Sequence, residues 1–252
     1  MFTREAVGLV ASGAERLVSL AGATEIRARA VVIATGVSYN RPAAEGVEAL
    51  LGKGVFYGAA TAEARALAGE NVFVVGAGNS AGQAAAHLAR YAATVTMLVR
   101  GSSLAATMSD YLIRQIERTP SIRVRLNTQV LRAAGTHHLG ALTVEDTETG
   151  TTETLSAAAL FVLIGAGPHT GWLAETVQRD ERGYILTGRS VRRGPARVPA
   201  WPLGREPYLL ETSLPGVFAA GDVRHRSVKR VTSAVGDGAI AIQSVHDYLS
   251  EE

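Results

Sequence analysis

The sequence predicts an α/β protein built on parallel sheets, and three observations lead to this prediction. Its 27 glycines and its alanine-rich strings suit tight turns and helices packed closely on a sheet. Residues 70–100 run as an apolar strand, a glycine turn, an alanine-rich helix and a second strand, the order of a βαβ unit. Three apolar runs end in glycine, at "ATG", "IGAG" and "AAGD", as expected if two similar nucleotide-binding sheets share the chain.

Composition limits the possible functions. The 252 residues, 47% of them hydrophobic, suffice for one large domain or two smaller ones. The net charge is +2 and the arginines are spread along the chain, so we expect no nucleic-acid partner. The longest apolar run, residues 157–166, is about half of a membrane span, and "MFTREAVG" lacks the features of a signal peptide. We therefore expect a cytoplasmic protein without a membrane span.

The chain contains no cysteine. This excludes disulfides, thiolate metal sites and a cysteine nucleophile, so redox chemistry would need a bound cofactor. His137 and His138 fall in a predicted hairpin turn, where a solvated loop is favoured over a metal pair. The sequence assigns no metal ligand and no catalytic side chain.

The elements before the βαβ unit are read from hydrophobic patterning. Residues 5–29 alternate weakly around two turns and predict a hairpin or meander. The β-branched run from Ala28 to Gly36 predicts a strand buried on both faces. Pro42 and the glycines near it predict an irregular connection.

After the βαβ unit we expect a helix over residues 104–118. Its core-facing stripe has four-residue spacing: Leu104, Met108, Leu112 and Ile116. Residues 122–156 predict a small antiparallel meander, and the apolar run from Ala159 to Pro168 predicts a buried strand.

The last part of the chain alternates loops with short elements. We expect a short helix near residues 170–177, an Arg/Pro-rich loop over 189–207, and a strand that opens at Gly216. A final helix begins near Thr232, with Thr232 or Ser233 as its N-cap.

The turn "VVGAGNSA" predicts a dinucleotide site. Gly76 permits the tight turn, Gly78 lets the backbone approach a pyrophosphate, and Ala81 permits close packing of the helix. Asn79 and Ser80 open that helix, whose free amides and dipole attract phosphates. The alternative is a glycine turn that binds no ligand.

The end of the second strand favours one dinucleotide. NAD sites usually carry an acidic residue there for the ribose 2′-hydroxyl. This chain has Arg100, Ser102 and Ser103 instead, a cation with hydroxyl donors that suits a 2′-phosphate. The sequence thus favours NADP, with NAD possible, and the alternative is that Arg100 simply ends a strand at the surface.

The stretch "TSLPGVFAAGD" indicates a second ligand site. Gly221 lets the chain approach a ligand, and Asp222 follows a strand at the carboxyl edge of a sheet, where its carboxylate can accept a ribityl hydroxyl. The basic run from Arg224 to Arg230 is either a solvated face or a surface that steers an acidic electron-transfer partner. His225, within that run, is either a surface histidine or a proton relay.

The order of "ATG", "VVGAGNSA", "TSLPGVFAAGDV" and "SAVGDGAIA" resembles the thioredoxin reductase-like flavoproteins of the pyridine nucleotide-disulfide oxidoreductase class. The resemblance covers nearly the whole chain from about Ala28. It implies two Rossmann-like, three-layer dinucleotide-binding domains, with the NAD(P)H domain (residues 43–167) inserted in an incomplete FAD domain (residues 1–42 and 168–252). It also implies a homodimer.

The resemblance carries specific roles for some residues. It implies that Thr35 and Gly36 lie at the edge of the FAD domain and that Asp222 binds the ribityl chain of FAD. Gly165, in the glycine-ended run "IGAG", is also among the residues expected to bind a cofactor. It implies that Arg230 and Val231 lie beside the flavin ring, and Lys229 next to them is also expected to bind the cofactor.

Two departures qualify the resemblance. Thioredoxin reductases carry a Cys-Ala-Thr-Cys disulfide where this chain reads Ala59-Ala60-Thr61-Ala62, so thiol–disulfide exchange by that route is excluded. The chain therefore resembles the cysteine-free branch. Residues 1–27 also lack the strand and GxGxxG turn that hold the ADP half of FAD in the family.

Two functions follow as expectations. The first is an NAD(P)H-dependent flavin oxidoreductase, with FAD and NADP as cofactors, that passes electrons to an external small molecule or small redox protein. The alternative is a truncated, catalytically inactive protein that binds a nicotinamide nucleotide.

Overall fold

The structure is a computed structural model of the 252-residue chain, and it describes residues 4–58, 64–173, 175–191 and 201–251. The chain divides into two compact units. Residues 39–165 form one of them, here called the inserted unit. Residues 1–38 and 166–252 together form the other, the outer unit.

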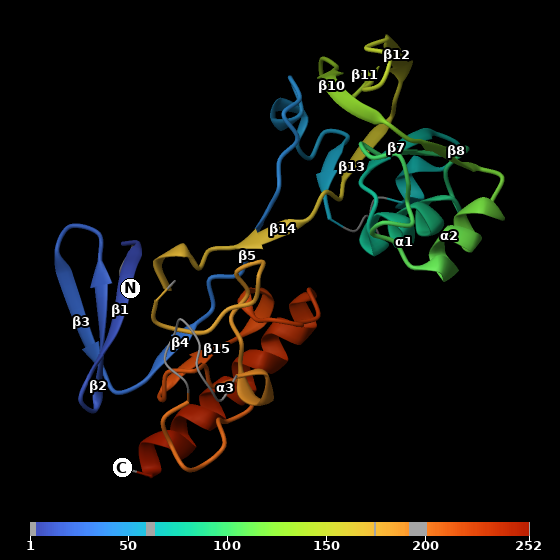
Figure 1. Ribbon diagram of the computed structural model, residues 1–252. Coiled ribbons are helices and arrows are strands. Elements are labelled where there is room, and N and C mark those ends of the chain that lie inside the picture. The colour runs from blue at the N-terminus through green and yellow to red at the C-terminus, as the bar shows by residue number, and fades with distance from the viewer. Residues whose placement is uncertain (1–3, 59–63, 174, 192–200, 252) are drawn as a thin grey trace. The chain divides into compact units, whose positions relative to one another are not determined.

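The inserted unit is built on a five-stranded parallel sheet in the order β6-β13-β7-β8-β9 (Figure 1). The sheet is flanked by two helices and by an antiparallel meander in the order β10-β11-β12. The strands of the sheet are β6 (Val55–Tyr57), β7 (Asn71–Val75), β8 (Thr94–Leu98), β9 (Ile122–Arg125) and β13 (Ala159–Val162). The flanking elements are α1 (Asn79–Leu88), α2 (Asp110–Glu117), β10 (Thr128–Ala134), β11 (Ala141–Asp146) and β12 (Thr152–Ser156).

Alternating residues of the sheet build two cores in this unit. Val72 and Val74 of β7 pack with buried residues of α1 and α2, such as Leu88 and Ile116. Phe73, between them in sequence, packs on the opposite face with residues of the meander. Because successive side chains of a strand point to opposite faces, the unit has three layers: helices, parallel sheet and meander. Two 3₁₀ turns complete it, Glu48–Leu50 and Ala64–Leu67.

The outer unit combines an antiparallel meander, short parallel strands and one long helix. Its meander has the order β1-β2-β3, and β4 pairs with β15 in parallel. The elements are β1 (Ala6–Ser12), β2 (Glu15–Leu20), β3 (Thr24–Ala28), β4 (Val31–Ile33), β15 (Val217–Ala219) and α3 (Val231–Ser250), with 3₁₀ turns at Gly171–Leu173, Gly188–Ser190 and Gly221–Val223. Strands β5 (Val37–Tyr39) and β14 (Ala166–Pro168) pair where the chain passes between the units.

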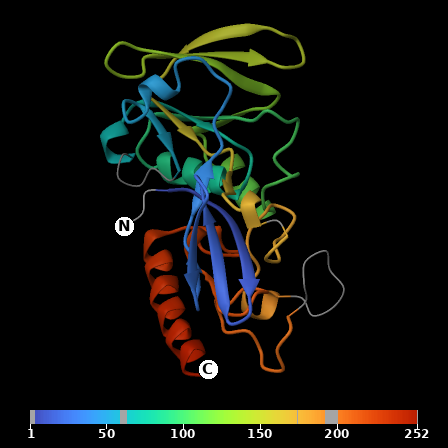
Figure 2. The same ribbon diagram turned by 90° about the vertical axis from the view of Figure 1, so that its left-hand side faces the viewer.

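One face of α3 carries exposed apolar side chains. Figure 2 shows α3 as an uninterrupted helix. Its Val231, Val235 and Ile242 are each more than half exposed. Spacings of four and seven residues place them on one side of a helix. No helix among the described residues is long and apolar enough to cross a membrane.

Several sequence predictions are confirmed. The βαβ unit forms as β7-α1-β8, with the two strands parallel. The N-terminal meander is present. The buried strand predicted over residues 159–168 forms over its first four residues as β13, whereas Ala166–Pro168 form the separate strand β14 that pairs with β5. The stripe on the predicted helix packs in the core, although Leu104 is only partly buried. His137 and His138 are exposed between β10 and β11.

Other predictions are wrong. The stretch at 122–125 pairs in parallel with β8 and extends the main sheet, so the meander begins only at β10. The helix predicted over residues 104–118 begins at Asp110, because residues before it form turns. Strand β4 is not buried on both faces, since Val32 is 38% exposed. The N-cap of α3 is Arg230, because Thr232 and Ser233 already lie in the first helical turn.

Candidate functional site

The turn after β7 has room only for glycine at Gly76. Its φ is +143°, and a Cβ added there would lie 2.5 Å from the carbonyl oxygen of Leu163. The Gly76 amide donates to the Leu98 carbonyl at 3.1 Å. The turn is therefore held between the ends of β13 and β8, and a side chain would displace it.

The two residues predicted to act with Gly76, Gly78 and Ala81, lie at the start of α1. Gly78 is the N-cap of α1, and the position of an added Cβ has no neighbour nearer than 4.0 Å. Ala81 is fully buried, 3.1 Å from the position of a Cβ on Gly76. The backbone near Gly78 is thus open, while Ala81 brings α1 close to the turn. An open turn at a helix N-terminus is suited to a pyrophosphate.

A loop before α2 is tied to this turn, and sequence reasoning missed it. The Thr107 hydroxyl donates to the Ala77 carbonyl at 2.9 Å, and the Ser109 amide donates to Asn79 Oδ1 at 2.8 Å. The Ser109 Oγ is buried and has no hydrogen-bond partner within the described part of the chain. The Oδ1 atom of Asn79 is thus occupied by a hydrogen bond from the loop, and Ser80 is exposed.

Arg100, Ser102 and Ser103 lie on the surface just beyond β8. The Arg100 guanidinium makes no hydrogen bond or ion pair with any residue described, so it is open to a ligand. Ser103 Oγ accepts the Ala105 amide at 3.0 Å. Gly165, with φ +94°, follows β13 and accepts the Asn40 amide at 3.0 Å. Since β7, β8 and β13 are parallel, Gly76, Arg100 and Gly165 follow strands at the same edge of the sheet.

The outer unit brings four of its predicted residues to the ends of two neighbouring strands. Thr35 and Gly36 follow β4, and Gly221 and Asp222 follow β15, its parallel partner. Gly36 and Gly221 have φ of +63° and +74°, which favour glycine. The carboxylate of Asp222 accepts no hydrogen bond from the residues that the structure describes, so it is available to a hydroxyl of a ligand.

Asp237 of α3 fixes this turn, and sequence reasoning did not single it out. Its Oδ2 accepts the Gly221 amide at 3.0 Å and the Arg224 guanidinium at 3.1 Å. Both side chains of the Arg224–Asp237 pair are largely buried. Arg224 is thus an internal cation rather than part of a solvated face.

The other residues of the basic run differ from Arg224. Lys229 Nζ lies 3.2 Å from Ser227 Oγ, 3.4 Å from the Asp222 carbonyl and 4.3 Å from the centre of the Tyr184 ring. Burial lowers the pKa of Lys229, against the attraction of Asp222 and Asp180. Arg230 is exposed, and Val231 opens α3.

His225 pairs with a carboxylate 45 residues earlier in the chain. Its Nδ1 lies 2.7 Å from Asp180 Oδ2. Asp180 Oδ1 accepts the amides of Arg182 and Tyr184, each at 2.9 Å. Burial by itself raises the pKa of Asp180, but these hydrogen bonds outweigh it and hold the pKa below its ordinary value of 3.8. Asp180 is therefore an anion near neutral pH.

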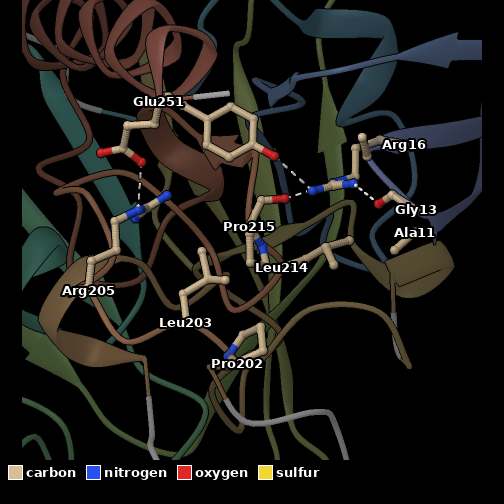
Figure 3. Close-up of a pocket in the computed structure, with 11 residues that line it drawn as sticks. Ala11, Gly13, Arg16, Pro202, Leu203, Arg205, Leu214, Pro215 and Glu251 are labelled. Carbon is tan, nitrogen blue, oxygen red and sulfur yellow. Dashed lines mark hydrogen bonds and ion pairs between the residues drawn. The ribbon is translucent and has the colours of Figure 1, made fainter.

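A cavity of about 450 Å³ lies elsewhere in the outer unit, between the β1–β2 turn and the end of α3 (Figure 3). None of the site residues predicted from sequence lines it. Buried Arg16 donates to the Pro215 carbonyl at 2.7 Å and to the Tyr248 hydroxyl at 3.0 Å. Arg205 donates to Glu251 at 3.0 Å and pairs with Glu211 at 2.7 Å. These arginines hold the cavity wall together.

Two further predictions concern metals and the redox disulfide. The described residues include no group of three or more His, Asp or Glu side chains placed to hold a metal ion. The segment Ala59-Ala60-Thr61-Ala62 lies outside the described residues.

The residues present fit a nicotinamide dinucleotide better than they fit all of FAD. The glycine turn at Gly76, the open backbone at Gly78 and the exposed Arg100 offer a turn, amides and a cation that suit a phosphorylated nucleotide. In the outer unit, Asp222 and the start of α3 suit the ribityl chain and ring of a flavin. Residues 6–28 are an antiparallel meander, which offers no glycine turn before a helix for the adenine end.

Comparison with known proteins gives concordant matches. The family profile "Pyridine nucleotide-disulphide oxidoreductase" matches residues 2–238. A thioredoxin reductase of Bacillus subtilis (strain 168) is 31% identical over 243 residues, 96% of this chain and 70% of the relative. One of Treponema pallidum (strain Nichols) is 31% identical over 222 residues, 88% of this chain and 65% of the relative.

A solved structure agrees with these matches. The crystal structure of thioredoxin reductase from Streptococcus pyogenes MGAS5005 has a TM-score of 0.80 at 27% identity. The match covers 99% of this chain and 74% of that one. The chain therefore spans about two thirds to three quarters of the length of these relatives.

Proposed function

Because this chain belongs to the pyridine nucleotide-disulphide oxidoreductase family and contains no cysteine, we propose that it is an NAD(P)H-dependent flavin oxidoreductase that works without a redox disulfide. The observation that carries the proposal is the glycine cradle at Gly76, where only a residue without a Cβ fits between two parallel strands. When bound, FAD would accept a hydride from the nicotinamide and pass electrons to an external acceptor.

The inserted unit would hold the nicotinamide nucleotide, in keeping with an NAD(P)H domain over residues 43–167. The turn from Gly76 to Ala81 and the first amides of α1 would bind the pyrophosphate. Arg100, with Ser102 and Ser103, would bind a 2′-phosphate, which favours NADP over NAD. Gly165 would lie at the same edge of the sheet.

The outer unit would hold the flavin end of FAD, in keeping with an FAD domain over residues 1–42 and 168–252. Asp222 would accept a hydrogen bond from a ribityl hydroxyl, and the start of α3 would face the ring with the positive end of its dipole. Thr35 and Gly36 would line the neighbouring strand end. Lys229, Arg230 and Val231 would lie beside the ring.

The acceptor would be a small molecule or a small redox protein. A dithiol relay is excluded because the chain has no cysteine. Exposed Arg226 and Arg230 could attract an acidic partner. A homodimer is part of the same proposal.

The visible absorption spectrum tests the proposal. Purified chain that has been incubated with FAD and freed of excess cofactor should keep the flavin band, and NADPH should bleach that band under anaerobic conditions. Asp222→Ala should lower retention of FAD, whereas Asp247→Ala, an exposed acidic residue later in α3, should not. A colourless protein that takes up no FAD would contradict the proposal.

A second candidate has its own support. A chain that only binds a nicotinamide nucleotide, without turnover, is favoured by the apolar face of α3 and the exposed Val32 of β4. Parallel sheets are usually covered on both faces, so such exposure suits an FAD unit that lacks part of its sheet. Retention of NADPH by a chain that retains no FAD would support this candidate.

A further inference from the structure

We infer that His225, oriented by Asp180, is a proton donor to the acceptor that this protein reduces. The inference rests on the proposed flavin oxidoreductase function and adds a residue with a chemical role to it. It is carried by the geometry around the imidazole, where one ring nitrogen is paired and the other has no partner among the described residues.

The backbone holds the two side chains in register. The His225 amide donates to the Ile185 carbonyl at 2.8 Å, and the Ile185 amide donates to the Val223 carbonyl at 3.1 Å. Asp180 sits in a turn closed by its amide hydrogen bond to Tyr184 at 2.9 Å, with Gly183 at φ +89°. Residues 180–185 and 223–225, which are far apart in sequence, are thus hydrogen-bonded to each other beside the pair.

The carboxylate determines which nitrogen of His225 is free. Asp180 Oδ2 is an anionic acceptor at 2.7 Å from Nδ1, so Nδ1 carries a hydrogen and donates it. Nε2 makes no hydrogen bond with any residue in the described part of the chain. About a quarter of the side chain is exposed, so solvent can resupply a proton to Nε2. An imidazole held by a carboxylate with its other nitrogen open is arranged for acid–base work.

The pair lies in the same cluster as the proposed flavin-binding residue. Lys229 is close enough to both Asp180 and Asp222 for each carboxylate to stabilise its charge, and it contacts the Asp222 carbonyl. The ring of Tyr184 lies under the Lys229 ammonium group. Burial raises the pKa of Tyr184, and the charges of both carboxylates add to this effect. The titratable and charged groups around the pair are Asp180, Arg182, Tyr184, Asp222, Arg224 and Lys229, with Asp237 contributed by α3.

The stoichiometry of the reaction requires a proton that the nucleotide does not carry. Reduction of a quinone follows NAD(P)H + H⁺ + quinone → NAD(P)⁺ + hydroquinone. The hydride supplies both electrons and one of the two hydrogens. The other hydrogen must arrive as a proton from the protein or the solvent. His225 Nε2 would donate it to the quinone oxygen and take another from water, while Asp180 acts as a positioning residue that stabilises the imidazolium.

The test uses FAD-loaded chain and 2-methyl-1,4-naphthoquinone as the acceptor, with the two half-reactions followed separately by stopped-flow absorbance. His225→Gln should slow reoxidation by the quinone by about 100-fold or more. Reduction by NADPH should stay unchanged. His246→Gln, an exposed histidine of α3, is the matched control and should alter neither half-reaction.

A spectroscopic measurement tests the pairing without turnover. Nitrogen-15 NMR of the neutral His225 ring should show the tautomer with the hydrogen on Nδ1, and Asp180→Asn should change that tautomer distribution. Asp180→Asn should also slow reoxidation, by less than His225→Gln.

Each outcome separates this inference from the proposed function. Normal bleaching by NADPH with unchanged reoxidation in His225→Gln would overturn the role of His225 and leave the oxidoreductase proposal standing. A wild-type chain that takes up no FAD, or that NADPH does not bleach, would overturn both.

Discussion

Arg205→Ala should destabilise the outer unit strongly, because it leaves a carboxylate buried without its cation. The Glu211 carboxylate is 0% exposed and accepts two hydrogen bonds from Arg205, at 2.7 and 3.1 Å. Its other partners are the amides of Tyr208 and Gly216, at 3.0 and 2.9 Å. After the substitution, these two neutral amides are the donors to Glu211 that remain among the described residues.

The expected loss is about 3–4 kcal/mol of unfolding free energy. Removing one partner of a buried ion pair costs about 3–5 kcal/mol, and the 24% exposure of the Arg205 side chain lets water reach Glu211, which favours the lower value. The guanidinium also lies 4.5 Å from the centre of the Tyr208 ring and 5.2 Å from that of Trp201, contacts worth about 0.5–1 kcal/mol.

Tryptophan fluorescence during urea denaturation measures this loss selectively. The chain has two tryptophans, Trp172 and Trp201, and both belong to the outer unit. Arg27→Ala is the control, because its ion pairs with Glu15 and Glu25 are largely exposed and should be worth less than about 1 kcal/mol. Adding Glu211→Gln to Arg205→Ala should recover part of the loss. A loss below about 1 kcal/mol for Arg205→Ala would refute the reasoning.

Three further predictions concern the nucleotide site and the response to pH. Gly76→Ala should cost about 1–3 kcal/mol of stability and weaken NADPH binding, measured by calorimetry, whereas Gly101→Ala meets nothing within 4 Å and should do neither. Arg100→Ala should weaken NADPH binding by about 1.5–3 kcal/mol and leave NADH binding almost unchanged; equal losses would argue against an NADP site. The folded-state pKa of Asp180 lies below 3.8, so its stabilisation is complete above that pH and is lost as pH falls through the lowered pKa. In urea denaturation at a series of acid pH values, the unfolding free energy of Asp180→Asn should fall less steeply with decreasing pH than that of the wild type. Equal slopes for the two proteins would contradict this prediction.

Local patterns were enough to predict the βαβ part of the inserted unit. The run of apolar residues, the glycines at 76 and 78 and the alanine-rich helix identify β7-α1-β8 without distant information, because each signal acts over a few residues. Strand β9 was assigned wrongly for the same reason. Its four residues carry no signal that distinguishes a parallel neighbour of β8 from the first strand of a meander.

The partners in the outer unit could not be predicted from local patterns. Asp180 and His225 are 45 residues apart, and Arg16 and Tyr248 are 232 residues apart. Such pairs depend on which segments the fold brings together. The cap of α3 was misplaced because threonine and serine favour both the N-cap and the positions near it, so the sequence fixes a helix start only to within a residue or two.

Anaerobic titration of FAD-loaded chain with NADPH tests the central claim most directly. A flavin oxidoreductase that binds NADPH at the Gly76 cradle should lose its oxidised flavin band in proportion to the NADPH added, and Gly76→Ala should require more NADPH for the same loss. A flavin band that persists in excess NADPH would contradict the claim that this chain transfers electrons from a nicotinamide nucleotide to a flavin.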